Sequence, residues 1–147
     1  MKNIDDNDFT RVYVMGNTDL IGVKDEKDIT IPKMCSYNIL IKQIACGKHH
    51  THLLTQDGYV YSMGFNNYGV LGLGQGEFQL AHVASPQLIQ GLYCIEQIAT
   101  GSGHTLALDM AKKVYAWGNP ENGAIGPTYL SSTCLPVELS ILGKLIQ

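Results

Sequence analysis

The sequence has few charged residues and no concentration of either sign. Ten basic and thirteen acidic residues give a formal net charge of −3, and charged residues make up only 16% of the chain. The densest basic cluster is the pair Lys112-Lys113. A nucleic-acid groove needs a concentrated positive field to neutralise phosphates, so direct DNA or RNA binding is disfavoured.

Long apolar runs are also missing. No stretch approaches the roughly 20 apolar residues that cross a bilayer as a helix, and residues 1–6 lack the apolar core of a secretory signal. The acidic segment 1–11 is interpreted as a solvated end, with a docking patch as the alternative. We therefore expect no membrane contact and an intracellular protein, cytoplasmic or nuclear.

Cysteine is sparse, and its spacing is irregular. The four residues lack the density of a disulfide framework, which favours reduced thiols: Cys35, Cys46, Cys94 and Cys134. The run Cys46-x-x-His49-His50-x-His52 has residue types that bind zinc. However, only His50 recurs as histidine in the second copy of this segment, at His104. We therefore expect no metal site, and we expect both repeat histidines to hydrogen-bond backbone groups.

Signatures of catalysis are not found. The chain has no serine elbow, no cysteine nucleophile motif and no pair of carboxylates with a reason to be buried. The glycines at positions 69, 72 and 74 are not followed by the Gly-Lys-Ser/Thr element of a phosphate-binding loop. The sequence predicts neither an enzyme nor a cofactor.

An internal repeat is the strongest positive signal. Residues 44–54 align with residues 98–108 at an offset of 54, and the register continues without a gap through the glycine-rich loops that follow. A partial earlier copy begins at Val12. A fixed period of 20 to 50 residues or so is typical of solenoids and propellers.

Each copy reads as four short strands. In the central copy we expect strands at 43–46, 50–55, 59–63 and 87–89, with Gln56-Asp57-Gly58 as a hairpin turn and Pro86 before the last strand. Four antiparallel strands make a propeller blade. In the later copy Ala111-Lys112 replaces Asp57-Gly58, so we expect a longer or looser turn there.

The motifs resemble one known repeat. Ile-x-x-Gly-x-x-His-Thr-x-x-Leu, then Asp-Gly-x-Val-Tyr-x-x-Gly, then Gly-x-Asn-x-x-Gly-x-Leu-Gly is similar to the repeat of the regulator of chromosome condensation family. The resemblance covers about residues 12–139 and implies an all-β propeller, of which this chain holds about two and a half to three blades. The expected organisation is an acidic segment 1–11, a partial repeat 12–43, a complete repeat 44–97 and a repeat 98–147 that stops before the next blade. Further blades, from the same or another chain, would complete the ring.

Residues shared between copies are expected to be structural. They are Gly47, His50, Gly64, Gly69, Gly72, Gly101, His104, Gly118, Gly123 and Gly126. Trp117 is added to this set because the resemblance implies a tryptophan at its position, although Met63 stands there in the central copy. Loop residues that differ between copies are better candidates for recognition, because a rigid scaffold displays binding groups on its loops. These candidates are Phe65, Asn67, Tyr68, Gln75, Glu77 and Phe78.

The predicted function is a non-catalytic protein-interaction scaffold within a larger protein or complex. The alternative that the resemblance implies is a guanine-nucleotide exchange factor for a small GTPase such as Ran. In that family, exchange uses a wedge inserted between strands, and the sequence shows no such insertion. A third possibility is a structural subunit of a large assembly, ordered beside its neighbours.

Overall fold

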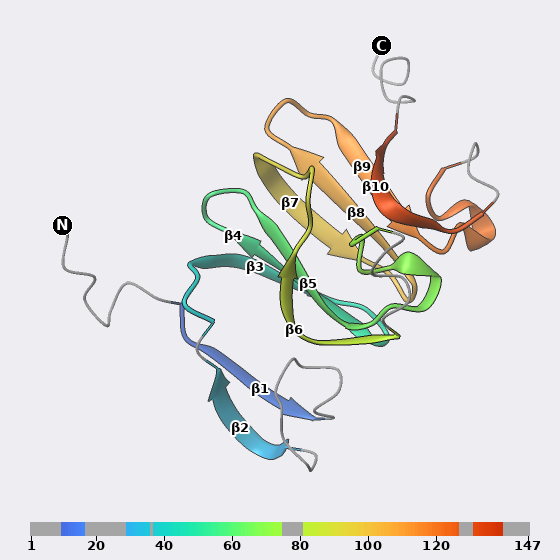
Figure 1. Ribbon diagram of the computed structural model, residues 1–147. Coiled ribbons are helices and arrows are strands. Elements are labelled where there is room, and N and C mark those ends of the chain that lie inside the picture. Colours follow the sequence, from blue (N-terminus) through green and yellow to red (C-terminus); the bar gives the residue numbers. More distant parts are fainter. Residues whose placement is uncertain (1–9, 17–28, 36, 75–80, 127–130, 140–147) are drawn as a thin grey trace.

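The computed structural model describes residues 10–16, 29–35, 37–74, 81–126 and 131–139. Within these ranges the chain forms three antiparallel sheets that lie side by side in chain order (Figure 1). The first has two strands and the other two have four each. The described part of the chain has no helix that is long and apolar enough to cross a membrane.

The two-stranded sheet pairs β1 (Val12–Gly16) with β2 (Ile29–Cys35). In the repeat register β1 corresponds to the third strand of a complete blade. Two strands would therefore precede it in a full blade, and this sheet is the outer half of one. Tyr13 and Met15 of β1 are 59% and 62% exposed.

The second blade is complete. Its strands run in the order β3 (Ile41–Cys46), β4 (His50–Thr55), β5 (Val60–Phe65) and β6 (His82–Leu88). A short 3₁₀ turn, η1 (Asn67–Gly69), follows β5. The third blade repeats this order with β7 (Ile95–Thr100), β8 (His104–Asp109), β9 (Val114–Gly118), η2 (Glu121–Gly123) and β10 (Thr133–Glu138). The expected propeller architecture, incomplete at two blades and a half, is confirmed.

The main core lies between the second and third blades. Leu54 and Val60 of the second blade pack with Ile98, Ala107 and Trp117 of the third, and all five are almost fully buried. Burying an aliphatic side chain of this size contributes about 1.5–3 kcal/mol relative to exposure. The two blades are therefore joined by a shared apolar layer.

Two of the predicted strands are longer than the sequence suggested. The first strand begins at Ile41, two residues before the expected start, and the fourth begins at His82, well before Pro86. Pro86 therefore lies inside a strand. This position is tolerated because β6 is the edge strand of its sheet, and its pairing with β5 is irregular beside the proline, between Ser62 and Gly64.

The expected longer turn at Ala111-Lys112 is wrong. Lys112 N–H donates to the Asp109 carbonyl over 3.0 Å, just as Gly58 N–H donates to the Thr55 carbonyl over 3.1 Å. Lys112 adopts a left-handed φ of 67°, close to the 80° of Gly58. The lysine therefore accepts the backbone strain that glycine avoids, and the turn keeps its length.

Candidate functional site

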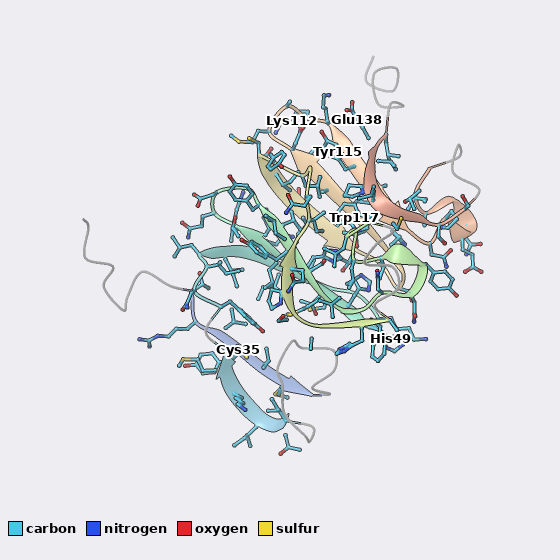
Figure 2. The ribbon with its side chains drawn as sticks, viewed as in Figure 1. Cys35, His49, Lys112, Tyr115, Trp117 and Glu138 are labelled. Carbon is cyan, nitrogen blue, oxygen red and sulfur yellow. The ribbon has the colours of Figure 1, made fainter. Side chains whose placement is uncertain are left out.

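One end of the blades gathers the β3–β4 and β7–β8 turns with the loops that follow β5 and β9. The β4–β5 and β8–β9 hairpins lie at the opposite end. Figure 2 shows this separation, with His49 at the first end and Lys112 and Glu138 at the other. Because blades repeat the same strand order, equivalent loops of neighbouring blades are brought together at one end.

A cleft of about 700 Å³ opens between the second and third blades at the His49 end. The second blade contributes its β3–β4 turn and the start of the loop after β5, and the third contributes the equivalent segments. The lining side chains include Lys48, His49, His50, Phe65, Asn67, Tyr68, Ser102, His104, Asn119, Glu121 and Asn122. We call this the inter-blade cleft.

Three of the six predicted recognition residues line this cleft. Phe65 is half-buried, and the centroid of its ring lies 6.2 Å from that of the His49 ring. Asn67 and Tyr68 are exposed. The other three candidates, Gln75, Glu77 and Phe78, lie outside the described residues. Partner binding by this set stays a prediction.

Tyr68 has an unusual backbone. Its φ is 62°, a left-handed conformation that is costly for a bulky residue. The register-equivalent residue, Asn122, has a φ of 57°, and asparagine tolerates this conformation well. Tyr68 nevertheless keeps 54% of its surface exposed. An exposed aromatic residue held in a strained turn is often a binding residue.

The repeat histidines pack on the repeat glycines. A Cβ atom added to Gly47 would overlap the His50 ring, and one added to Gly101 would overlap the His104 ring. These glycines are required by close approach rather than by a positive φ. This close packing explains the Gly-x-x-His spacing.

His50 and His52 are buried without complete hydrogen bonding. Within the described residues, Nε2 of His50 and both ring nitrogens of His52 have no hydrogen-bond partner. Burial, then the proximity of His104 and His49, lowers the pKa of His50 to about 4. Burial, then the proximity of His50, lowers the pKa of His52 well below its ordinary value. Both rings are therefore neutral near pH 7.

The glycine-rich loop after β5 is held by hydrogen bonds within its own blade and by one from the third blade. Asn66 Oδ1 accepts a hydrogen bond from Leu71 N–H, and Ser62 Oγ donates to the Leu71 carbonyl over 2.8 Å. Trp117 of the third blade then donates its indole N–H to the Val70 carbonyl over 2.8 Å. Trp117 lies near the centre of Figure 2 and is fully buried.

The other shared glycines lie in these loops and at the strand ends. Gly64 and Gly118 close their third strands against the preceding turn, where an added Cβ would lie 2.5 Å from the His49 and Gly103 carbonyl oxygens respectively. Gly69 is packed against Cys134 of β10 in the next blade. Left-handed backbone is found at Gly69, Gly72, Gly123 and Gly126.

A zinc site does not form from the histidine-rich segment. Cys46 and His49 are exposed, whereas His52 is fully buried and contacts the Trp117 ring at 5.5 Å between centroids. Across the described ranges, no group of three or more His, Cys, Asp or Glu side chains could hold a metal ion.

Several cleft residues were not identified from the sequence. The sequence presented His49 only as a possible metal ligand, and it did not single out Asn119, Glu121 or Asn122 as recognition residues. The repeat register offered a signal, because these last three are the counterparts of Phe65, Asn67 and Tyr68. Candidate positions in one copy could have been transferred to the other.

Models of one family match the chain over its central part. The regulator of chromosome condensation (RCC1) repeat matches residues 57–108, and a second model of the same repeat matches residues 41–70 and 95–124. Together these matches extend over more than half of the sequence. The chain belongs to the RCC1 repeat family.

Curated proteins with similar sequences contain this repeat as a small part. The human X-linked retinitis pigmentosa GTPase regulator is 36% identical over 102 residues, covering 69% of this chain and 10% of that protein. Human probable E3 ubiquitin-protein ligase HERC6 is 34% identical over 128 residues, covering 84% of this chain and 12% of that protein. The chain thus spans about a tenth of these relatives.

Solved RCC1 structures share the fold. Yeast RCC1 (Prp20) bound to Kap60 matches with a TM-score of 0.76 at 25% identity, covering 90% of this chain and 33% of that one. Prp20p from Saccharomyces cerevisiae, reported with its binding properties to Gsp1p and histones, also has a TM-score of 0.76. In that case 92% of this chain and 35% of Prp20p are covered. This chain therefore corresponds to about a third of those chains.

Proposed function

We propose that this RCC1 repeat segment is a non-catalytic scaffold that binds a protein partner at the inter-blade cleft, as part of a larger protein or complex. The observation that carries the proposal is the clustering of copy-specific side chains from two blades around one opening. Phe65 and Tyr68 come from one blade, and Asn119, Glu121 and Asn122 come from the next.

The chemistry of the cleft suits a protein surface. Aromatic rings at Phe65 and Tyr68 and amide side chains at Asn67 and Asn122 line the same cleft. Interfaces are enriched in aromatic anchors because a rigid ring contributes a large contact area with few rotatable bonds. Amides at the rim can donate and accept hydrogen bonds to a partner's backbone.

The strain at Tyr68 supports the same proposal. A tyrosine in a left-handed turn costs about 1–3 kcal/mol, whereas its counterpart Asn122 is tolerated there. The tyrosine has no structural duty that its exposed position would explain. Recognition of a partner gives a reason for the tyrosine at this position.

Site-specific photo-crosslinking tests the proposal. A benzophenone amino acid replaces Tyr68 in one variant and Tyr93, at the opposite end of the blades, in another. The two tyrosines are matched in exposure, at 54% and 55%. We expect a protein adduct from position 68 and none of that mass from position 93.

Affinity measurements with the purified partner complete the test. Tyr68→Ala and His49→Ala should each weaken binding at least tenfold, and Tyr93→Ala should leave it unchanged. Equal effects from both ends of the blades, or no effect from the cleft variants, would contradict the proposal.

A second candidate is guanine-nucleotide exchange on a small GTPase such as Ran. It is favoured by the likeness to a protein named as a GTPase regulator and to Prp20p, which was studied with Gsp1p. The test is release of fluorescent GDP from Ran with and without the longest polypeptide that contains this chain. Faster release that Tyr68→Ala abolishes would support exchange, and an unchanged rate would remove this candidate.

A further inference from the structure

The inter-blade cleft gathers basic side chains from both of its blades. Four such residues line it, namely Lys48, His49, His50 and His104. The positive charges of His104 and His49 contribute to the low pKa of His50, after burial as the main cause. Charges influence one another in this way only over short distances, because salt screens them within about 10 Å. The three imidazoles therefore lie close together, although His104 belongs to the other blade.

Backbone hydrogen bonds hold the two β-turns of this group side by side. Lys48 N–H donates to the Ser102 carbonyl over 3.3 Å. In the third blade, Asn119 N–H donates to the Gly103 carbonyl over 2.8 Å, which ties the β7–β8 turn to the loop after β9. The position of Lys48 beside the third blade is thus fixed by the backbone.

These basic groups have no acidic counterpart nearby. Within the described residues Lys48 forms no ion pair, and Glu121 is the one acidic residue that lines the cleft. Glu121 is hydrogen-bonded to Asn119, because its Oε2 accepts from Nδ2 over 3.3 Å and its N–H donates to Oδ1 over 3.1 Å. The pKa of His50 is shifted by burial and by two other histidines, without a carboxylate among the causes.

One buried ring nitrogen at the cleft is also unused. His50 is 3% exposed and lines the cleft, and its Nε2 has no hydrogen-bond partner among the described residues. A buried polar atom without a partner is costly to a fold. An atom of this kind at an opening between two blades indicates a polar ligand.

An aromatic ring borders the basic group. The Phe65 ring meets the His49 ring edge to face, with 76° between their planes. Apolar surface reduces the hydration of a neighbouring ion pair, which strengthens the attraction between its charges. A charged side chain that entered the cleft here would therefore be held more firmly than on open surface.

We propose that the inter-blade cleft takes an aspartate or glutamate side chain of the protein partner, whose carboxylate pairs with Lys48 and lies against His49 and His104. This inference rests on the proposed function and names the chemical group that the cleft recognises. A basic side chain fits less well, because it would find one carboxylate, Glu121, that Asn119 already binds.

A carboxylate at this place makes binding depend on pH. The titratable side chains at the cleft or next to it are Lys48, His49, His50, Tyr68, His82, His104 and Glu121. A bound carboxylate favours the protonated form of an imidazole beside it, so protons are taken up on binding. The affinity should therefore rise as the pH falls from 7.5 to 6.0, a range in which a glutamate side chain stays ionised.

The first test uses a small carboxylate in place of the partner. N-acetyl-glutamate methylamide and its neutral analogue, N-acetyl-glutamine methylamide, are titrated into the ¹⁵N-labelled chain at pH 6.0. The titration extends to about 50 mM, because a single ion pair binds weakly. We expect saturable shifts of the Lys48, His49 and His104 amide signals with the glutamate compound and none with the glutamine compound. At pH 7.5 the dissociation constant should be about threefold larger.

Three lysine variants locate the carboxylate. Lys48→Ala should abolish the saturable shifts, and Lys48→Arg should keep them, because a guanidinium also pairs with a carboxylate. Lys42→Ala is the matched control: it also removes an exposed lysine of the second blade, from the hollow beside Lys112 at the opposite end, and should bind as the parent does. The same spectra report that each variant is folded.

Three results would overturn the inference: no saturable shift with the glutamate compound, equal shifts with both compounds, or unchanged binding by Lys48→Ala. The proposed function fails in a different way, because the crosslink from position 68 captures a partner whatever its charge. An adduct at position 68 without any preference for the carboxylate would remove the acidic side chain alone. Binding of the carboxylate without an adduct would count against the protein partner instead.

Discussion

The indole N–H of Trp117 donates a hydrogen bond to the Val70 carbonyl over 2.8 Å, although the two residues belong to different blades and lie 47 positions apart. Gly72 makes this contact possible, because a Cβ there would lie 2.9 Å from the indole nitrogen. A core residue of the third blade thus supplies a hydrogen bond to the loop of the second blade.

Because Trp117 and Gly72 are in contact, we expect substitutions at these two positions to have non-additive effects on the unfolding free energy. Trp117→Phe leaves the buried Val70 carbonyl without its donor, which should cost about 1–3 kcal/mol of unfolding free energy. Gly72→Ala adds a Cβ against the ring at a φ of 72° and should cost a similar amount, about 1–3 kcal/mol. Urea unfolding of both single variants and the double variant measures the coupling. We expect the double variant to lose less than the two single losses combined, and strict additivity would contradict the contact.

The packing of His104 on Gly101 predicts that Gly101 and Gly103, two glycines of the same turn, differ in their tolerance of an alanine substitution. Gly101→Ala should be strongly destabilising, because its Cβ would overlap the His104 ring. Gly103→Ala, whose Cβ would meet Asn119 Cβ at 3.5 Å, should be tolerated. Thermal melts of the two variants make the comparison, and adding His104→Ala to Gly101→Ala should recover part of the loss. Equal melting points for the two glycine variants would show that ring packing is not the cause.

Acid should weaken the fold through its buried histidines. The unfolded chain binds protons at histidine near pH 6.5, whereas the folded pKa of His50 is about 4 and that of His52 is well below its ordinary value. Between pH 6.5 and 4 the unfolded state therefore binds more protons. Each such histidine removes at most about 1.4 kcal/mol of unfolding free energy per pH unit as the pH falls.

His52→Leu isolates this effect, because leucine is the natural counterpart at Leu106. The variant should be more stable at pH 5, with a shallower decline between pH 7 and 5, since two buried nitrogens without partners are removed. Urea unfolding across this range is the measurement. Met110→Leu, at an exposed position without a titratable group, is the control and should keep the parent slope. A parent slope in the His52 variant would count against the prediction.

The two hairpins predict different tolerance of side chains. Gly58→Ala would place a Cβ 2.9 Å from the Cys94 Cα and Ile95 N atoms at a φ of 80°, and should cost about 1–3 kcal/mol. Lys112→Ala keeps a side chain where one is already tolerated, and it removes only the exposed ion pair with Glu96, so it should leave the unfolding free energy nearly unchanged. Chemical denaturation measures the unfolding free energy of both variants, and an equal loss from the two substitutions would contradict this prediction.

The repeat made the blades predictable, because the offset between copies fixed the strand order and the alternation fixed the faces. His50–Thr55 was located to the residue. The start of β6 was missed because proline normally signals a strand beginning, while an edge strand lets Pro86 lie within it. Lys112 was missed because neighbouring strands imposed a turn that local preference resists.

The inter-blade cleft was only half predictable. Phe65, Asn67 and Tyr68 stood out as copy-specific loop residues, but their closeness to Asn119 and Glu121 depends on how two blades pack side by side. Period and spacing determine a blade, and they do not state the distance between the loops of neighbouring blades. The buried contact of His52 with Trp117 was hidden for the same reason.

The Trp117 contact also bears on how such arrays diversify. Met63 stands in the second blade where Trp117 stands in the third, so only the third of these two blades carries an indole N–H at this position. A recombination event that duplicated or exchanged one repeat would separate Trp117 from the Gly72 loop that accommodates it. To preserve this contact, a recombination event must transfer the loop around Gly72 and the strand with Trp117 as one segment. That segment runs from the loop of one blade into the core of the next.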